Sequence, residues 1–193
     1  MNTVPVRSKP TQLFLSRDRY LFSLGHKTNH SSTATIMGLL KNLDPLLTAD
    51  VLHILRSMGH GDKVLITDIN FPAAEVASKT TTGKHVILTT DLPPVIDAIC
   101  SVLPLDYFSE HRIHYMCPDA GIDLPGSGGE VKSAFTTAIR KHSDSSLTPI
   151  ERMNFYEESR KCFAVIQTHE RRPYANIILQ KGVVGPDGGD LKP

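Results

Sequence analysis

The sequence predicts an α/β fold with three layers, α/β/α, built on a mostly parallel sheet. Helical and strand patterns alternate from residue 39 onward, as expected for a sheet covered by helices. The 193 residues suit one domain with flexible ends better than two domains. A hydrophobic fraction of 40% is enough apolar material for one core.

The first helices are predicted from capping residues next to apolar residues at helical spacing. Thr48 can cap a helix that ends at Gly59, because glycine favours the left-handed conformation found after helices. Asp91 caps a second helix, whose first turn holds two prolines at positions where missing amide donors cost little. Residues 130–141 form a third predicted helix.

A fourth helix is predicted to begin at Thr148 and to run to about Lys161. Thr148 would be the cap, Pro149 would take the first helical position, and Glu151 would reach back to the cap. The strands are predicted from short β-rich runs at residues 63–68, 85–89, 112–116, 163–167 and 176–180.

Bulk properties exclude several classes of partner. The net charge of +1 favours neither nucleic acid nor an anionic membrane surface, and no apolar run is long enough to span a bilayer. Cys100, Cys117 and Cys162 are widely spaced and odd in number, which argues against a disulfide framework. They fit a reducing compartment, so we expect a cytoplasmic protein.

The two ends of the chain differ from residues 38–184, which we expect to form the folded domain. Residues 1–37 carry five basic residues against the single acid Asp18. They are predicted to be a disordered extension, and a mitochondrial presequence stays open as the alternative, although prolines interrupt any early amphipathic helix. Residues 185–193 are rich in Gly and Pro and are predicted to be a flexible tail.

No cofactor or metal motif meets its spacing requirement. Thr82-Gly83-Lys84 lacks the Ser or Thr that follows the lysine of a phosphate loop, and Gly126–Gly129 lacks the GxGxxG spacing. His111, His114 and Cys117 lie near one another in sequence, but nothing else completes a metal site there. We therefore expect neither a cofactor nor a metal.

His60 is the first candidate for chemistry. It lies in Met58-Gly-His-Gly-Asp62, between a predicted helix and a predicted buried strand. The flanking glycines allow a sharp turn and a close approach of a ligand to the ring. A histidine here can exchange protons with a hydroxyl near neutral pH. The alternative is a loop histidine that caps the helix.

A second group of polar residues is a candidate for ligand binding. Asp68 follows the first predicted strand, at the end opposite to His60, so a site with both residues requires loops that fold over or a second subunit. Arg152 and Tyr156 are neighbours on one helix face, and Tyr174 and Asn176 precede the last strand. These donors and acceptors can hold sugar hydroxyls. The alternatives are a turn-forming Asp68, a surface arginine and half-buried core tyrosines.

At these segments the sequence resembles the fucose mutarotase/ribose pyranase family. The resemblance covers nearly all of residues 38–184 and does not reach residues 1–37. It rests on Met58-Gly-His-Gly-Asp62, Thr67-Asp-Ile-Asn-Phe-Pro72, Leu103-Pro-Leu-Asp106, Phe155-Tyr-Glu157, Phe163-Ala-Val-Ile166, Thr168-His-Glu170 and Tyr174-Ala-Asn-Ile-Ile-Leu179.

The resemblance implies a sugar mutarotase that interconverts the anomers of a monosaccharide, with L-fucose as the expected substrate, and a homo-oligomer. It implies that His60 is the acid–base residue. It also implies catalytic roles for Tyr156 and Asp106 and sugar-binding roles for Asp68, Arg152, Tyr174 and Asn176.

The resemblance does not fix the sugar. Gly61, Asp106 and Arg152 are similar to the fucose branch, whereas Tyr174-Ala-Asn176 and His169 depart from it. A D-ribose pyranase and a non-catalytic sugar-binding protein of the same fold therefore remain as alternatives.

Overall fold

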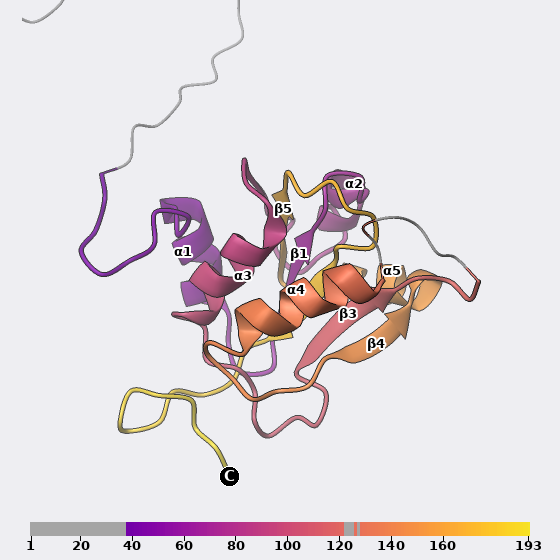
Figure 1. Cartoon of the computed structure of the whole chain (residues 1–193). Helices are drawn as coiled ribbons and strands as arrows, with labels where there is room; N and C mark the ends of the chain where they lie inside the picture. Colours follow the sequence, from indigo (N-terminus) through magenta and orange to yellow (C-terminus); the bar gives the residue numbers. More distant parts are fainter. Residues whose placement is uncertain (1–37, 122–125, 127) are drawn as a thin grey trace, which may run out of the picture. The chain divides into compact units, whose positions relative to one another are not determined.

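The structure of the chain is a computed structural model that describes residues 38–121, 126 and 128–193 (Figure 1). The expectations for residues 1–37 lie outside the described residues. The helices and strands are α1 (Ala49–Ser57), β1 (Lys63–Thr67), α2 (Ala73–Ala77), β2 (His85–Leu88), α3 (Leu92–Cys100), β3 (Ile113–Cys117), α4 (Gly129–Ile139), β4 (Thr148–Glu151), α5 (Arg152–Arg160), β5 (Ala164–Thr168) and β6 (Ile177–Gln180).

The strands of the described residues form one sheet in the order β2-β5-β1-β6-β3-β4. The pairs β2–β5, β1–β5 and β3–β4 are parallel, whereas β6 runs antiparallel to both β1 and β3. Only β6 therefore points against the other strands, and the predicted mostly parallel sheet is confirmed. The carboxyl ends of β1 to β5 and the amino end of β6 lie at the same edge.

Helices cover both faces of the sheet (Figure 1). The core on one face contains apolar side chains of α1, α3 and α4, and the core on the other face contains those of α2 and α5. Successive residues of β1 point to opposite faces, so Val64 and Ile66 enter the first core and Leu65 enters the second. The predicted α/β/α arrangement is confirmed.

The predicted start of the fourth helix is wrong. Thr148–Glu151 is the edge strand β4, paired with β3, and α5 begins only at Arg152. Pro149 is tolerated because an edge strand leaves backbone groups without a partner strand. The cap is the side chain of Glu151, which accepts hydrogen bonds from the amides of Met153 and Asn154 at 3.0 and 3.2 Å.

The predicted position of the α3 cap is right, but the expected side-chain bond is absent. Asp91 directly precedes α3 with extended backbone angles, and its side chain makes no capping hydrogen bond. The carboxylate of Glu170 accepts from the Leu92 amide instead, at 3.4 Å. This cap could not be predicted from the sequence, because Glu170 lies far from Leu92 in the chain, in the loop after β5.

The turn that carries His60 is tied to the end of β6. The ammonium group of Lys181 donates to the carbonyl oxygens of Leu55 and Met58, at 2.8 and 2.6 Å, where α1 ends. A cation is favourable there because the last carbonyls of a helix lack partners within the helix. The amide of Gly61, at φ 85°, donates to the Lys181 carbonyl at 2.8 Å.

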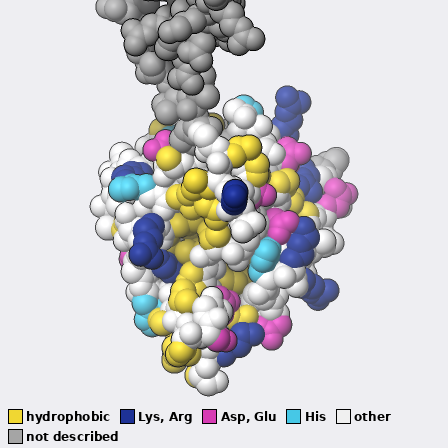
Figure 2. All heavy atoms as spheres, turned by 90° about the vertical axis from the view of Figure 1, so that its left-hand side faces the viewer, with side chains coloured by type: hydrophobic (Ala, Val, Ile, Leu, Met, Phe, Trp, Pro, Cys, Tyr) yellow, Lys and Arg dark blue, Asp and Glu magenta, His cyan; other side chains and the backbone are white. Residues whose placement is uncertain are grey.

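The face that carries α1 exposes apolar surface. Figure 2 shows hydrophobic side chains gathered over the centre of this face, with basic and acidic side chains around them. Leu39 and Leu40, in the segment that leads to α1, are 78% and 63% exposed. The described residues therefore leave apolar surface uncovered beside α1.

The C-terminal residues fold back on themselves through hydrogen bonds such as that from the Leu191 amide to the Val183 carbonyl, 2.9 Å long. The flexible tail stays a prediction. Gly182 precedes this segment and lies against the loop that ends in Asp106. A Cβ atom on Gly182 would lie 2.3 Å from the carbonyl oxygen of Leu105. Only glycine fits this contact between the tail and the loop.

We expect Gly182→Ala to lower the free energy of unfolding by about 3 kcal/mol, because the clashing neighbour is backbone and must move. Urea unfolding followed by circular dichroism measures the change. Gly129→Ala is the matched control, since its new methyl group meets nothing within 4 Å. Equal stability of the Gly182 variant and the unmodified protein would contradict the close contact.

Candidate functional site

A polar pocket of about 250 Å³ opens at the carboxyl edge of the sheet. Ligands of open α/β sheets bind at this edge, because loops from several strands meet there. The pocket brings together the four predicted sugar-binding residues and Tyr156. Its lining is Asp68, Asn70, Phe71, Met116, Arg152, Tyr156, Pro173, Tyr174 and Asn176.

Asp68 and Asn176 form the floor of this pocket, and both are buried. The Asn176 amide nitrogen donates to one Asp68 carboxylate oxygen at 3.0 Å, and its amide oxygen accepts from the Asp68 backbone at 3.1 Å. The other carboxylate oxygen accepts from the amides of Asn70 and Phe71, at 2.8 and 2.9 Å. Asp68 therefore forms a turn, as its alternative role predicted, and also lines the pocket.

Burial raises the pKa of the Asp68 carboxyl to about 6, because removal from water disfavours the ionised form. The hydrogen bonds from Asn70, Asn176 and Phe71 act in the opposite direction and only partly offset the cost of burial. A carboxyl group that titrates near neutral pH can donate or accept a proton, which is common at functional sites.

Arg152, Tyr156 and Tyr174 form the wall of the pocket. Arg152 and Tyr156 come from the first turns of α5, so the predicted shared helix face is confirmed. Tyr156 packs on Phe71 with ring centroids 5.4 Å apart. Tyr174 has φ 62°, a conformation that is uncommon for a side chain of this size and that is often found at functional sites.

His60 and Asp106 lie at the opposite edge of the sheet. His60 Nε2 is 3.1 Å from a carboxylate oxygen of Asp106, and the side chains are 51% and 4% exposed. Asp106 also accepts from the Gln180 side chain at 2.7 Å and from the Phe108 amide at 3.1 Å. A buried carboxylate that is fixed in this way orients an exposed imidazole.

The two groups of predicted site residues therefore do not meet within the described chain. His60 precedes β1 and Asp68 follows it, and a strand of five residues is about 16 Å long. The three predicted catalytic residues are divided between the edges: Tyr156 lies in the pocket, and His60 and Asp106 lie at the other edge.

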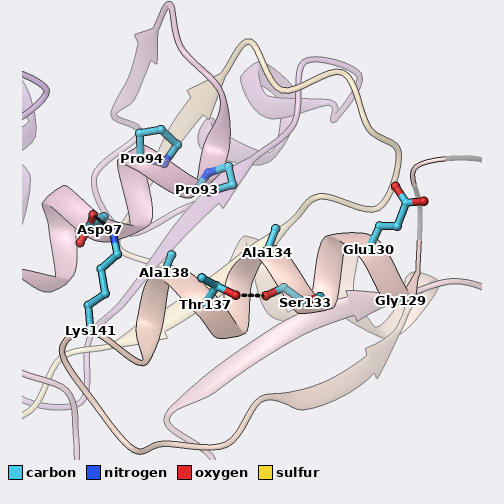
Figure 3. Close-up of a pocket in the computed structure, with 10 residues that line it drawn as sticks. All are labelled: Pro93, Pro94, Asp97, Gly129, Glu130, Ser133, Ala134, Thr137, Ala138 and Lys141. Atoms are coloured by element: carbon cyan, nitrogen blue, oxygen red, sulfur yellow. Dashed lines mark hydrogen bonds and ion pairs between the residues drawn. The ribbon is translucent and has the colours of Figure 1, made fainter.

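A larger hollow, of about 760 Å³, lies between α3 and α4 and holds none of the predicted site residues (Figure 3). Small side chains such as Ser133 and Ala134 line it, together with prolines of α3. Of its three charged residues, Asp97 and Lys141 form an ion pair with each other, which leaves Glu130 as the third. This hollow is therefore a weaker candidate for chemistry than the polar pocket.

Sequence reasoning missed several residues of the two sites. Asn70 and Phe71 lie inside a segment that carried the resemblance, so their position was a usable signal. Met116, which is buried, and Gln180, which is half-buried, gave no signal, because nothing in their sequence context distinguishes them from other strand residues. Asp119, whose carboxylate accepts from Arg152 Nε at 2.8 Å, gave none either.

The described residues contain no group of three or more His, Cys, Asp and Glu side chains placed to hold a metal ion. In the same part of the chain, no helix has both the length and the apolar character needed to cross a bilayer.

Comparison with known proteins gives the family. Residues 41–184 match the model of the RbsD / FucU transport protein family. The chain belongs to this family. It is 34% identical over 157 residues to the fucose mutarotase of Homo sapiens, with 77% of this chain and 96% of the human protein covered. It is 32% identical over 155 residues to the fucose mutarotase of Danio rerio, with 78% and 98% covered.

A solved relative has the same fold. The fucose mutarotase of Streptococcus pneumoniae, crystallised in complex with L-fucose, superimposes on the present chain with a TM-score of 0.67. The two sequences are 32% identical, and the alignment covers 76% of this chain and all of the other. The resemblance stated from the sequence is confirmed.

We expect the Asp68 carboxyl to titrate with a midpoint of about 6 when followed by carbon NMR of the side chains. Folding raises the pKa of this carboxyl, so its ionisation costs more free energy in the folded state than in the unfolded state. The folded state therefore loses stability as the pH rises. The stability difference between unmodified protein and Asp68→Asn should therefore fall by about 2 kcal/mol between pH 4 and pH 7. Urea unfolding across this range measures it, and a constant difference with a midpoint near 4 would contradict the burial effect.

Proposed function

We propose that this protein is a mutarotase that interconverts the α and β anomers of L-fucose. One observation carries the proposal: the chain combines a polar pocket with an exposed histidine held by a buried carboxylate. The relatives named fucose mutarotase, one of them in complex with L-fucose, support this sugar.

Mutarotation opens the cyclic hemiacetal and closes it again on the other face of C1. The anomeric hydroxyl loses a proton while the ring oxygen gains one, and both steps reverse on closure. His60 can carry out such transfers, because its Nε2 faces Asp106 and its Nδ1 has no hydrogen bond to the described residues. Asp106 fixes the orientation of the ring.

The pocket residues bind and orient the sugar. Arg152 can donate to hydroxyl oxygens, and the phenols of Tyr156 and Tyr174 can both donate and accept. Asp68 and Asn176 fix each other, so the pocket floor needs little rearrangement on binding. Tyr156 is the second candidate for proton transfer, because its phenol lies among these sugar-binding groups.

Two alternatives differ in the outcome of a simple assay. A D-ribose pyranase would exchange ribose anomers faster than fucose anomers, and Tyr174-Ala-Asn176 keeps this alternative open. A non-catalytic sugar-binding protein would bind the sugar without exchange and would not need His60. Saturation-transfer NMR with both sugars separates these three functions.

We further propose that the complete site forms between two copies of the chain in a homo-oligomer. Each copy has the sugar pocket at one edge of its sheet and His60 at the other edge. A pocket of about 250 Å³ lies just below the usual range of ligand cavities, about 300–1,000 Å³, as expected for a site that a neighbour completes.

Apolar side chains at both edges support this assembly. Phe108 is 55% exposed and stacks edge-on against His60, with ring centroids 6.0 Å apart. At the pocket edge, Ile69 and Met153 are 43% and 56% exposed. Contact between the two edges would bury these side chains and bring His60 of one copy to the pocket of the next.

We propose the cytoplasm as the location of the protein. Its three cysteines are unpaired. Burial raises the pKa of the Cys100 and Cys162 thiols to about 12, so these two thiols are unreactive. Free thiols fit a reducing compartment. Imaging of the tagged protein tests this location.

We expect His60→Ala to lower the rate of L-fucose anomer exchange by about 10²–10⁴-fold, with a small change in sugar affinity. The reason is that proton transfer contributes mainly in the transition state. Saturation-transfer NMR gives the rate, and titration with the sugar gives the affinity. His53→Ala is the matched control, because His53 is an exposed histidine of α1.

Three outcomes would change the assignment. Exchange no faster than in buffer for the unmodified protein, with both sugars, would remove the enzyme function. Binding without exchange would favour the sugar-binding alternative. Near-normal exchange by His60→Ala, together with loss of exchange in Tyr156→Phe, would make Tyr156 the proton carrier.

We expect activity to reappear when two inactive variants, His60→Ala and Asp68→Asn, are unfolded together and refolded. Asp68→Asn places a second amide against Asn176 and should disable the pocket. If each site takes one edge from each of two copies, random mixing restores about one quarter of the sites. Exchange that stays at the level of the separate variants would place both edges of the site in one subunit, and a monomer by light scattering would exclude the assembly.

A further inference from the structure

The Arg152 side chain is held by a single carboxylate. Arg152 Nε donates to Asp119 at 2.8 Å, and this is its one hydrogen bond to the described residues. Arg152 begins α5 and lines the sugar pocket, whereas Asp119 lies two residues after β3 and is not part of the lining. Both side chains are partly covered, with 40% and 31% exposed.

The carboxylate of Asp119 has no other use in the described part of the chain. Its first oxygen is buried without a hydrogen-bond partner, and its second accepts only from Arg152. It forms neither a turn nor a helix cap, in contrast to Asp68, which accepts from the amides of Asn70 and Phe71. A partly buried carboxylate that accepts from no backbone amide can affect the pocket only through the arginine that it binds.

The geometry of the contact leaves the arginine able to bind a ligand. The guanidinium has donors on Nε and on both terminal nitrogens, and Asp119 takes only Nε. The terminal nitrogens make no hydrogen bond to the described residues and remain available for sugar hydroxyls. Held in place at Nε, Arg152 loses less conformational freedom when the sugar binds than a free arginine would.

We propose that Asp119 is a positioning residue for sugar recognition: it holds Arg152 against the pocket and so sets the affinity for the sugar. The inference rests on the proposed function, because it assigns Asp119 to the same pocket. Proton transfer lies elsewhere, at His60 or Tyr156, so Asp119 affects binding and leaves the chemical step unchanged.

The competing explanation is a surface ion pair that contributes only to stability. Such pairs are common in this protein, for example Arg160 with Glu157 at 2.7 Å on the same helix. The two explanations differ in their effect on the sugar. A surface pair changes unfolding and leaves the KM unchanged, whereas a positioning residue changes the KM and does so only while Arg152 is present.

The test is a double-mutant cycle on the full chain with L-fucose. We expect Asp119→Ala to raise the KM for anomer exchange about three- to ten-fold with kcat nearly unchanged, because the arginine must then be ordered by the sugar. The KM of Asp119→Asn should lie between those of the unmodified protein and Asp119→Ala, since the amide oxygen can still accept from Nε of Arg152. In an Arg152→Ala background, Asp119→Ala should change the KM less than about two-fold.

Controls separate folding from positioning. Glu157→Ala, which removes a surface pair of α5, should leave the KM unchanged, and thermal unfolding of each variant shows whether it is folded. An unchanged KM in both Asp119 variants, or an equal effect of Asp119→Ala with and without Arg152, overturns the inference. Failure of the unmodified protein to bind or exchange L-fucose would instead reject the proposed function.

Discussion

The antiparallel pairing of β6 with β1 is the interaction on which both candidate sites depend. The register places Lys63 opposite Gln180 and Ile66 opposite Ile177. At one end, the pairing brings Asn176 onto Asp68. At the other end, it brings Lys181 onto the turn of His60. A parallel β6 would reverse these ends and would separate every one of these contacts. The one reversed strand of the sheet therefore joins segments more than a hundred residues apart.

A buried aspartate anchors each edge, and its surroundings determine its role. Asp68 loses hydration and keeps a raised pKa, since the hydrogen bonds it accepts only partly compensate for burial. Asp106 is equally buried, and one of its three donors is the imidazole of His60, alongside Phe108 and Gln180. The first therefore suits a pocket where a proton can be shared with a ligand. The second suits a fixed acceptor that orients an imidazole.

The sequence predicts the elements better than it predicts their contacts. Apolar spacing and caps locate α1 and β1 closely, because local energetics decides them. The start of α5 is wrong because Thr148, Pro149 and Glu151 carry a helix-start pattern, yet pairing with β3 stabilises this segment as an edge strand. The separation of His60 from Asp68 follows from strand polarity alone. The Asp119–Arg152 pair could not be predicted, since only the packing of β4 against β3 brings these residues together.

Separation of the two edges fits the chemistry of mutarotation. After the ring opens, C1 must rotate about its bond to C2, so a site that gripped both ends of the sugar tightly would slow the reaction. In the proposed assembly, the pocket with Asp68 and Asn176 holds the hydroxyls on a fixed floor. His60, half exposed and attached through one side-chain hydrogen bond to Asp106, approaches from another copy of the chain. Binding and proton transfer then rest on different subunits, which leaves the anomeric end free to turn while the rest of the sugar stays oriented.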